Sequence, residues 1–211
     1  MYKLSLTTIL LFISIQLNNI RQNAHIILSS NHLKLANIDC SDYDQNGVQH
    51  CVVGISSDNL TVVRQQNTEW CWAASISAIF SYYGHDVSQE RIVAETFGTI
   101  ANVPGQPSQI YRALNRTWTD DSGDDFVVNA DVLSANAFTA IQDLTNAYPL
   151  IVGTLGHAMV LTSMEYNHDV YNHIAVTSAV VRDPWPYNAN RRILSLTEFR
   201  NISFLARIRI N

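Results

Sequence analysis

A cysteine and a nearby side-chain amide are placed in this sequence where they can support acyl-transfer chemistry. Cys71 follows Gln65 by six positions and begins the uncharged stretch 71–84. A cysteine in the first turn of a helix faces unpaired backbone N–H groups, which favour the reactive thiolate over the thiol. The amide of Gln65, or of its neighbour Gln66, can join the backbone N–H of Cys71 in stabilising an oxyanion. The stretch therefore predicts a nucleophile beside an oxyanion site.

A histidine and a carboxylate further along the chain can activate that thiol. Of the seven histidines, His157 is the best candidate for a general base, because it follows a glycine and opens an apolar strand-like run. Asp183 ends the next such run and can accept the second ring N–H of His157, which would fix the tautomer of the ring. Trp185 can shield that hydrogen bond from water. The remaining candidates are predicted to lie in loops or on the surface: His85, His168 and His173.

In chain order, the motifs Gln-x5-Cys-Trp-Ala-Ala-Ser, Gly-His-Ala and Asp-Pro-Trp resemble those of the papain-like cysteine peptidases. The resemblance implies that Gln65 contributes to the oxyanion hole, that Cys71 is the nucleophile and that His157 is the base. It further implies that Asp183 orients the histidine. The implied activity is that of a cysteine-type endopeptidase, a thiol protease acting on a protein or peptide substrate, and the implied mechanism needs neither a metal nor an organic cofactor.

The sequence also departs from the papain pattern. Residues 68–70, Thr-Glu-Trp, replace the Gly-Ser lead-in to the cysteine, and the orienting residue is aspartate where papain has asparagine. The matching part spans only residues 61–211. These features resemble the compact bacterial papain-like group, which includes effector peptidases of plant pathogens and the peptidase domains of bacteriocin exporters.

Each of these residues also has a purely structural interpretation. A buried cysteine between two tryptophans is often a packing residue, and an Asp-Pro pair after a strand is often a turn. The same catalytic set is also compatible with a cell-wall amidase or an acyl transferase. A further alternative is an inactive papain-like binding module, although the complete set Gln65, Cys71, His157 and Asp183 argues against it.

The hydrophobic pattern predicts an α+β fold. We expect a helical part that carries Cys71, packed on an antiparallel sheet that carries His157 and Asp183, with the active-site cleft between them. Ser88 and Gly98 have the types expected at the start and end of a helix. Helices are predicted at 71–84, 88–97, 108–114 and 137–146, and strands at 150–152, 157–164, 174–181, 192–196 and 203–210.

Composition limits the class of protein. With 211 residues, of which 47% are hydrophobic, the chain can form one globular domain with a sizeable core and an N-terminal extension. The formal net charge is −5 and no cluster of Lys and Arg exists, which argues against a nucleic-acid partner. The composition leaves the oligomeric state open.

The N-terminus is predicted to be a targeting segment. Residues 4–17 are mostly apolar, but a membrane-spanning helix needs roughly 20 such residues. We therefore predict a signal peptide at 1–24, a secreted or periplasmic protein, and no stable membrane insertion after processing; an uncleaved anchor is the alternative. Residues 25–60 are predicted to be an N-terminal extension, a linker or short pro-segment, or an extra strand.

Three cysteines are present in the chain. If Cys71 is kept free for chemistry, Cys40 and Cys51 remain as a disulfide that closes a short polar loop, which suits an exported protein. The loop at 42–47 also resembles the first half of a calcium loop, but Val53 stands where the bidentate glutamate is needed. The sequence therefore predicts a disulfide here and no metal site.

Overall fold

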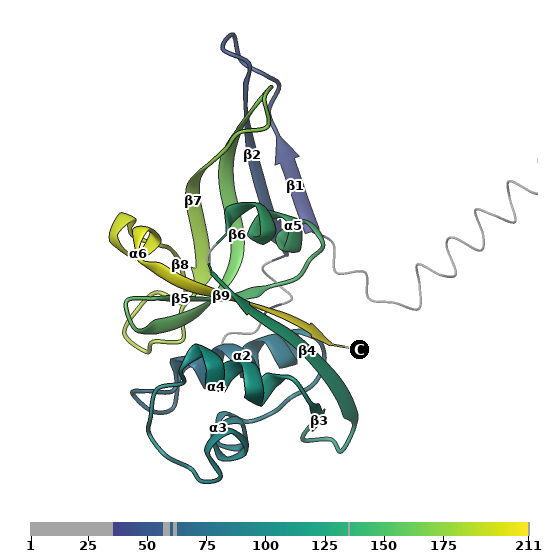
Figure 1. Cartoon of the computed structure of the whole chain (residues 1–211), viewed down its shortest axis with the longest axis vertical. Helices are drawn as coiled ribbons and strands as arrows, with labels where there is room; N and C mark the ends of the chain where they lie inside the picture. The colour runs from purple at the N-terminus through teal and green to yellow at the C-terminus, as the bar shows by residue number, and fades with distance from the viewer. Residues whose placement is uncertain (1–35, 57–59, 61–62, 135, 211) are drawn as a thin grey trace, which may run out of the picture. The chain divides into compact units, whose positions relative to one another are not determined.

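The computed structural model describes residues 36–56, 60, 63–134 and 136–210 (Figure 1). The signal peptide predicted at 1–24 lies outside the described residues, as does the first part of the predicted extension. The chain divides into the units 1–34 and 35–211, and the second unit contains every element described below. No helix within the described ranges is both long enough and apolar enough to cross a membrane.

The strands of the described residues form one large antiparallel sheet (Figure 1). Its order is β1-β2-β6-β5-β9-β4-β3, and β7 pairs with β6 and with β8. The bounds are β1 Ala36–Cys40, β2 Val48–Ile55, β3 Thr117–Thr119, β4 Asp125–Leu133, β5 Leu150–Thr154, β6 His157–Asp169, β7 Ile174–Arg182, β8 Arg191–Ile193 and β9 Ile202–Ile210.

The helices that pack on the sheet form two groups. Helices α2, α3 and α4 lie together, with α2 packed on β5 and β6 and α4 packed on β4 and β9, whereas α5 packs on β1, β2 and the central strands (Figure 1). Their bounds are α2 Cys71–Tyr82, α3 Gln89–Phe97, α4 Pro107–Leu114, α5 Ala137–Thr145 and α6 Leu196–Arg200. The predicted α+β fold, with the helix that begins at Cys71 packed on an antiparallel sheet, is confirmed.

Local sequence signals explain where the shorter helices begin. The Ser88 side chain accepts a hydrogen bond from the N–H of Arg91, and Gly98 ends α3 in the left-handed conformation with φ 74°. Helix α4 begins one residue earlier than predicted, because its cap is Gln106, which exchanges hydrogen bonds with Gln109, and Pro107 occupies the first turn. Ser108, the first residue of the predicted helix, is therefore its second residue.

Helix α2 lies at the centre of the hydrophobic core. Eleven of its twelve residues are buried, and its apolar side chains pack with residues of the sheet. Because water is excluded from nearly all of this helix, the side chain of its first residue, Cys71, has a fixed position relative to β6.

The predicted extension at 25–60 includes β1 and β2. Strand β2 pairs with β6 along residues 48–54, and so belongs to the same sheet as the predicted site. The predicted disulfide is present, and it joins Cys40 of β1 to Cys51, its direct cross-strand partner in β2.

The strand predicted at 192–196 is wrong in its second half. Strand β8 ends at Ile193, and residues 196–200 form the short helix α6. The reason is a capping box, in which Ser195 accepts from the N–H of Glu198 while the Glu198 carboxylate accepts from the N–H of Ser195. Five residues are too few to show the helical periodicity on which the prediction relied.

Candidate active site

Cys71 is the first residue of α2, and the helix begins there without a side-chain cap. The cysteine is free and largely buried. Further into the helix, the Ser75 hydroxyl contacts the carbonyl oxygen of Cys71 at 2.9 Å and that of Ala158 in β6 at 3.3 Å. Ser75 thus joins the first turn of the helix to the strand that carries the predicted base.

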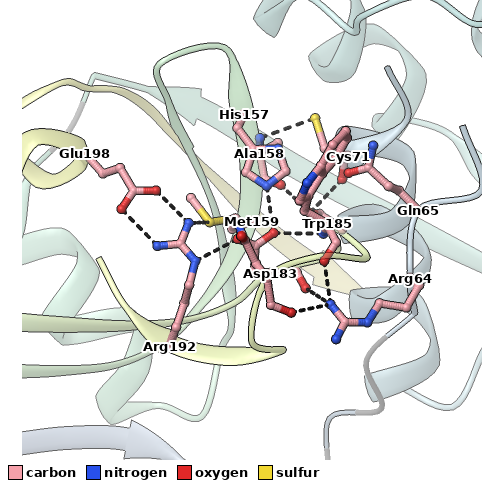
Figure 2. Close-up of polar contacts among 12 residues, drawn as sticks. Arg64, Gln65, Cys71, His157, Ala158, Met159, Asp183, Trp185, Arg192 and Glu198 are labelled. Carbon is pink, nitrogen blue, oxygen red and sulfur yellow. Dashed lines mark hydrogen bonds and ion pairs between the residues drawn. The ribbon is translucent and has the colours of Figure 1, made fainter. Parts of the chain in front are cut away.

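His157 is the first residue of β6 and follows a tight turn. In that turn Leu155 has φ 50° and Gly156 has φ 79°, so both residues adopt the left-handed conformation that suits the twist of a hairpin. The turn brings the start of β6 against Cys71, where the N–H of Ala158 donates to Sγ of Cys71 at 3.4 Å. The His157 ring lies beside the sulfur of Cys71 (Figure 2), which is one of the groups that raise the pKa of the ring.

Asp183 follows β7 and is fully buried. Its Oδ1 accepts hydrogen bonds from Nε2 of His157 at 2.8 Å and from the N–H of Trp185 at 2.8 Å. Its Oδ2 accepts from Nδ2 of Asn188 at 2.8 Å and from Nε of Arg192 at 2.7 Å. Burial alone would raise the pKa of this carboxyl, but the four donors hold it well below its usual range. Asp183 is therefore a carboxylate aimed at the imidazole.

His157 lies between the carboxylate and the thiol. Burial lowers the pKa of His157, but its hydrogen bonds to Asp183 and Cys71 and the charges of these two groups outweigh burial and raise the pKa to about 9. Because Nε2 points to Asp183, the other ring nitrogen is the one left to face Cys71. The site can therefore hold an imidazolium beside the sulfur, which is the arrangement that stabilises a thiolate.

Gln65 and Gln66 differ in their surroundings. Gln65 is buried, and its Nε2 donates to the carbonyl oxygens of Asn67 at 2.8 Å and Thr68 at 2.9 Å. Its Oε1 is buried and has no hydrogen-bond partner among the described residues. Gln66 is exposed, and its amide lies against Glu90 of α3. Of the two, Gln65 is the one on the side of the site (Figure 2).

Trp185 packs beside the imidazole as expected from its position after the acid. Its ring meets the His157 ring edge-on, with centroids 6.4 Å apart and planes at 87°. Trp185 is half-buried, and Tyr187 packs against its other side with centroids 6.0 Å apart. The ring thus covers one side of the histidine, and this limits the access of water to the hydrogen bond with Asp183.

The loop that carries Asp183 is held by an arginine that sequence reasoning missed. Nη1 of Arg64 donates to the carbonyl oxygens of Asp183 at 3.3 Å, Trp185 at 2.6 Å and Asn188 at 3.1 Å (Figure 2). The next residue, Gln65, donates its backbone N–H to the carbonyl oxygen of Pro184. The segment before the nucleophile helix is therefore attached to the loop of the acid.

Two further charged residues that the sequence did not indicate hold the carboxylate of Asp183: Arg192 binds it directly, and Glu198 binds Arg192. Arg192 of β8 contacts Asp183 with one edge of its guanidinium and Glu198 of α6 with the other (Figure 2). The only sequence signal was the spacing of Ser195 and Glu198, which is that of a capping box and does not point to a catalytic site.

A cleft of about 330 Å³ opens beside Cys71 and His157. One wall is the loop that approaches Trp72, where a Cβ on Gly105 would come within 2.6 Å of the indole ring. The other walls are the β5–β6 turn and the start of β9. Its lining consists of Cys71, Trp72, Pro104–Pro107, Gly153, Thr154, Gly156–Ala158, Ser203 and Phe204.

Two of the other histidines, His85 and His173, do not line this cleft. His85 pairs with Asp120 at 2.9 Å and stacks on Phe126, so it joins the segment after α2 to the β3–β4 hairpin. His173 is exposed and pairs with Asp169 at the end of the β6–β7 hairpin. Among the described residues, no group of His, Cys, Asp and Glu is arranged to hold a metal ion.

Comparison with known proteins places the chain in a family. The model of the Peptidase C39 like family matches residues 57–207. A search of curated proteins found no match. A solved structure of a double glycine motif protease from an AMS/PCAT transporter, in complex with the leader peptide, is similar with a TM-score of 0.46 and 15% identity, over 71% of this chain and 90% of that one. Because the family model covers more than half of its length, the chain belongs to the Peptidase C39 like family.

Proposed function

We propose that the chain is a cysteine peptidase that hydrolyses peptide bonds with Cys71, His157 and Asp183. Membership of a peptidase-like family supports peptide hydrolysis as the general activity. The observation that carries the specific proposal is the position of the His157 ring, which is held at 2.8 Å by the buried Asp183 and lies beside the free Cys71 (Figure 2).

The first half of the reaction forms an acyl-enzyme. The Cys71 thiolate attacks the carbonyl carbon of the peptide bond, and a C–S bond forms as the carbonyl oxygen becomes an oxyanion. The oxyanion collapses and the C–N bond breaks, while the imidazolium of His157 gives its proton to the departing amine. Asp183 keeps the ring in the orientation that this proton transfer requires.

The oxyanion is stabilised by donors at the start of α2. The backbone N–H of Cys71 is in the uncapped first turn of the helix, so it is available to the substrate oxygen. We propose Gln65 as the second donor. To serve, its amide exchanges one of its hydrogen bonds, to Asn67 or Thr68, for one to the oxyanion.

The second half releases the product. Neutral His157 takes a proton from a water molecule, the resulting hydroxide attacks the thioester, and the C–S bond breaks to give a carboxylic acid and the Cys71 thiolate. The imidazolium is restored at the same time, so the enzyme returns to its starting protonation state.

The test uses a mixture of unstructured peptides incubated with the wild-type chain and with Cys71→Ala, with the products analysed by mass spectrometry. We expect pairs of fragments whose masses add up to the mass of the parent peptide plus one water, and no fragments from Cys71→Ala, whose circular dichroism should match the wild type. Equal cleavage by Cys71→Ala contradicts the proposal. Products that carry an added amine favour an acyl transferase, and cleavage of peptidoglycan fragments alone favours a cell-wall amidase.

A further inference from the structure

The carboxylate of Asp183 is bound by Arg192, a residue that does not line the cleft. Arg192 lies in the centre of β8, opposite Val181 of β7, so its backbone is fixed by the sheet next to the loop of the acid. Its Nε donates to Oδ2 of Asp183 at 2.7 Å, while Oδ1 of the same carboxylate accepts from His157. The two oxygens of Asp183 thus link the guanidinium to the imidazole.

The guanidinium of Arg192 is itself held by two other residues. Nη1 and Nη2 donate to the two carboxylate oxygens of Glu198 at 2.9 and 2.6 Å, and Nη2 also contacts Sδ of Met159 at 3.1 Å. A planar guanidinium bound on both edges cannot rotate without breaking several hydrogen bonds. Its Nε is therefore held in the direction of Asp183.

Glu198 is anchored in turn by the cap of α6. Its Oε2 accepts from the N–H and from the hydroxyl of Ser195, both at 2.8 Å. The hydrogen bonds from Arg192, together with those from Ser195, outweigh burial and lower the pKa of Glu198 to about 2. A continuous series of alternating charges therefore runs from the start of α6 to the ring of His157.

We infer that Arg192 is a positioning residue for the peptidase reaction, and that Glu198 adjusts its effect by balancing its charge. Arg192 keeps the fully buried carboxylate of Asp183 ionised and directs the other oxygen, Oδ1, toward His157. Without Glu198, the full charge of Arg192 would act on Asp183 and on the Cys71–His157 pair. This inference rests on the proposed function, because it assigns Arg192 a role in the reaction of Cys71.

Arg192 and Glu198 should shift the ionisation of the Cys71–His157 pair in opposite directions. A cation near the site favours the thiolate of Cys71 and the carboxylate of Asp183, whereas an anion opposes both. Removal of the Arg192 charge therefore makes the surroundings more negative, and removal of the Glu198 charge makes them less negative. The charged groups that contact Asp183 are His157 and Arg192, together with Arg64, which reaches only its main-chain oxygen.

The experiment measures the rate at which a small haloacetamide alkylates Cys71 as a function of pH, by peptide mapping of the full chain. The variants are Arg192→Met, which removes the cation, and Glu198→Gln, which removes the anion but keeps a side chain suited to the capping box. Arg191→Met is the matched control, because Arg191 is the exposed neighbour of Arg192 in the same strand.

We expect the acidic midpoint of the alkylation profile to rise by about 1 pH unit in Arg192→Met and to fall by about half a unit in Glu198→Gln. Arg191→Met should match the wild type. Unfolding would expose Cys71 as an ordinary thiol and would raise the midpoint, so each variant is first shown to be folded by circular dichroism. Unfolding cannot produce the downward shift expected in Glu198→Gln. If Arg192→Met does not fold, the downward shift in Glu198→Gln decides the test alone.

Unmoved midpoints, or midpoints that move in the same direction, would overturn the inference. Alkylation does not depend on peptide cleavage, so the inference and the proposed function can fail separately. Opposite shifts in a chain that cleaves no peptide would contradict the proposed function alone, whereas cleavage without these shifts would contradict only the role of Arg192 and Glu198.

Discussion

The protonation of His157 decides the pH range in which the site can work. Its hydrogen bonds to Asp183 and Cys71 raise its pKa from 6.5 to about 9 despite burial. The imidazolium that we propose as the proton donor to the leaving amine is thus retained at neutral pH. By the same linkage, the stabilising effect of the raised pKa is fully present below pH 6.5 and is lost as the pH rises through 9.

We therefore predict that kcat/KM falls on the alkaline side with an apparent pKa of about 9. The measurement is the pH dependence of peptide cleavage under conditions in which the enzyme remains folded. In Asp183→Asn the alkaline limb should move toward the usual range of histidine, near pH 6.5, because the charge that favours the imidazolium is gone. An alkaline limb that is the same in both proteins would show that Asp183 does not act on His157.

The sequence indicated Cys71 and His157 as candidate site residues, but it did not indicate Arg192 and Glu198. Cys71 and His157 stand out because each opens an apolar element, and a charged or reactive group rarely occurs there without a function. Arg192 lies in a predicted strand and Glu198 just after it, and charged residues at such positions usually face water. Only the tertiary structure shows that this stretch turns inward and reaches Asp183.

At the scale of elements, α5 is attached to the sheet by a buried ion cluster. Asp143 is buried and accepts hydrogen bonds from Arg207 of β9 at 2.6 and 2.8 Å, and from Arg209 of the same strand. Arg209 also covers the ring of Tyr148, at 3.8 Å from its centroid. These contacts connect the end of α5 to the strand next to β5.

We predict that Asp143→Ala lowers the free energy of unfolding by about 3 kcal/mol, because two arginines lose their buried partner. Each arginine side chain keeps about a quarter of its surface exposed, 28% for Arg207 and 27% for Arg209, so water recovers part of the loss. Urea unfolding measures the change. The control is Asp131→Ala, an exposed carboxylate that also acts on Arg207, and it should change stability by less than about 0.5 kcal/mol. Equal effects of the two variants would contradict the proposed role of the cluster.

The longer elements could be predicted from periodicity, and the exceptions have physical causes. Helix α2 and strands β5, β7 and β9 are found close to their predicted ranges, since each has a long apolar face. Strand β6 begins where predicted but continues to residue 169, beyond its predicted end at 164. No element was predicted for residues 126–133, which form most of β4. There the buried residues Phe126, Val128 and Ala130 alternate with exposed ones at 127, 129 and 131. The pairing of β2 with β6 depends on residues more than 100 positions apart, which no local pattern reveals.

At the scale of the whole described unit, the site is assembled from distant parts of the chain. Cys71 comes with the helices, whereas His157 and Asp183 come with the sheet. Ser75 connects α2 to β6, and Arg64 connects the segment before α2 to the loop of Asp183. Under the proposed function, packing of α2 against the sheet is therefore a requirement for activity as well as for stability, because the thiol meets the imidazole only in the folded unit.

The most direct test of the central claim is the rate of Cys71 alkylation by a haloacetamide at pH 6, compared between the wild type and His157→Ala by peptide mapping. If the imidazolium stabilises a thiolate, the wild-type chain should react at least about tenfold faster than His157→Ala, because the loss of one paired charge is worth a pKa unit or more. Slow labelling at equal rates in the two folded proteins would contradict the account, since Cys71 would then be an ordinary buried thiol.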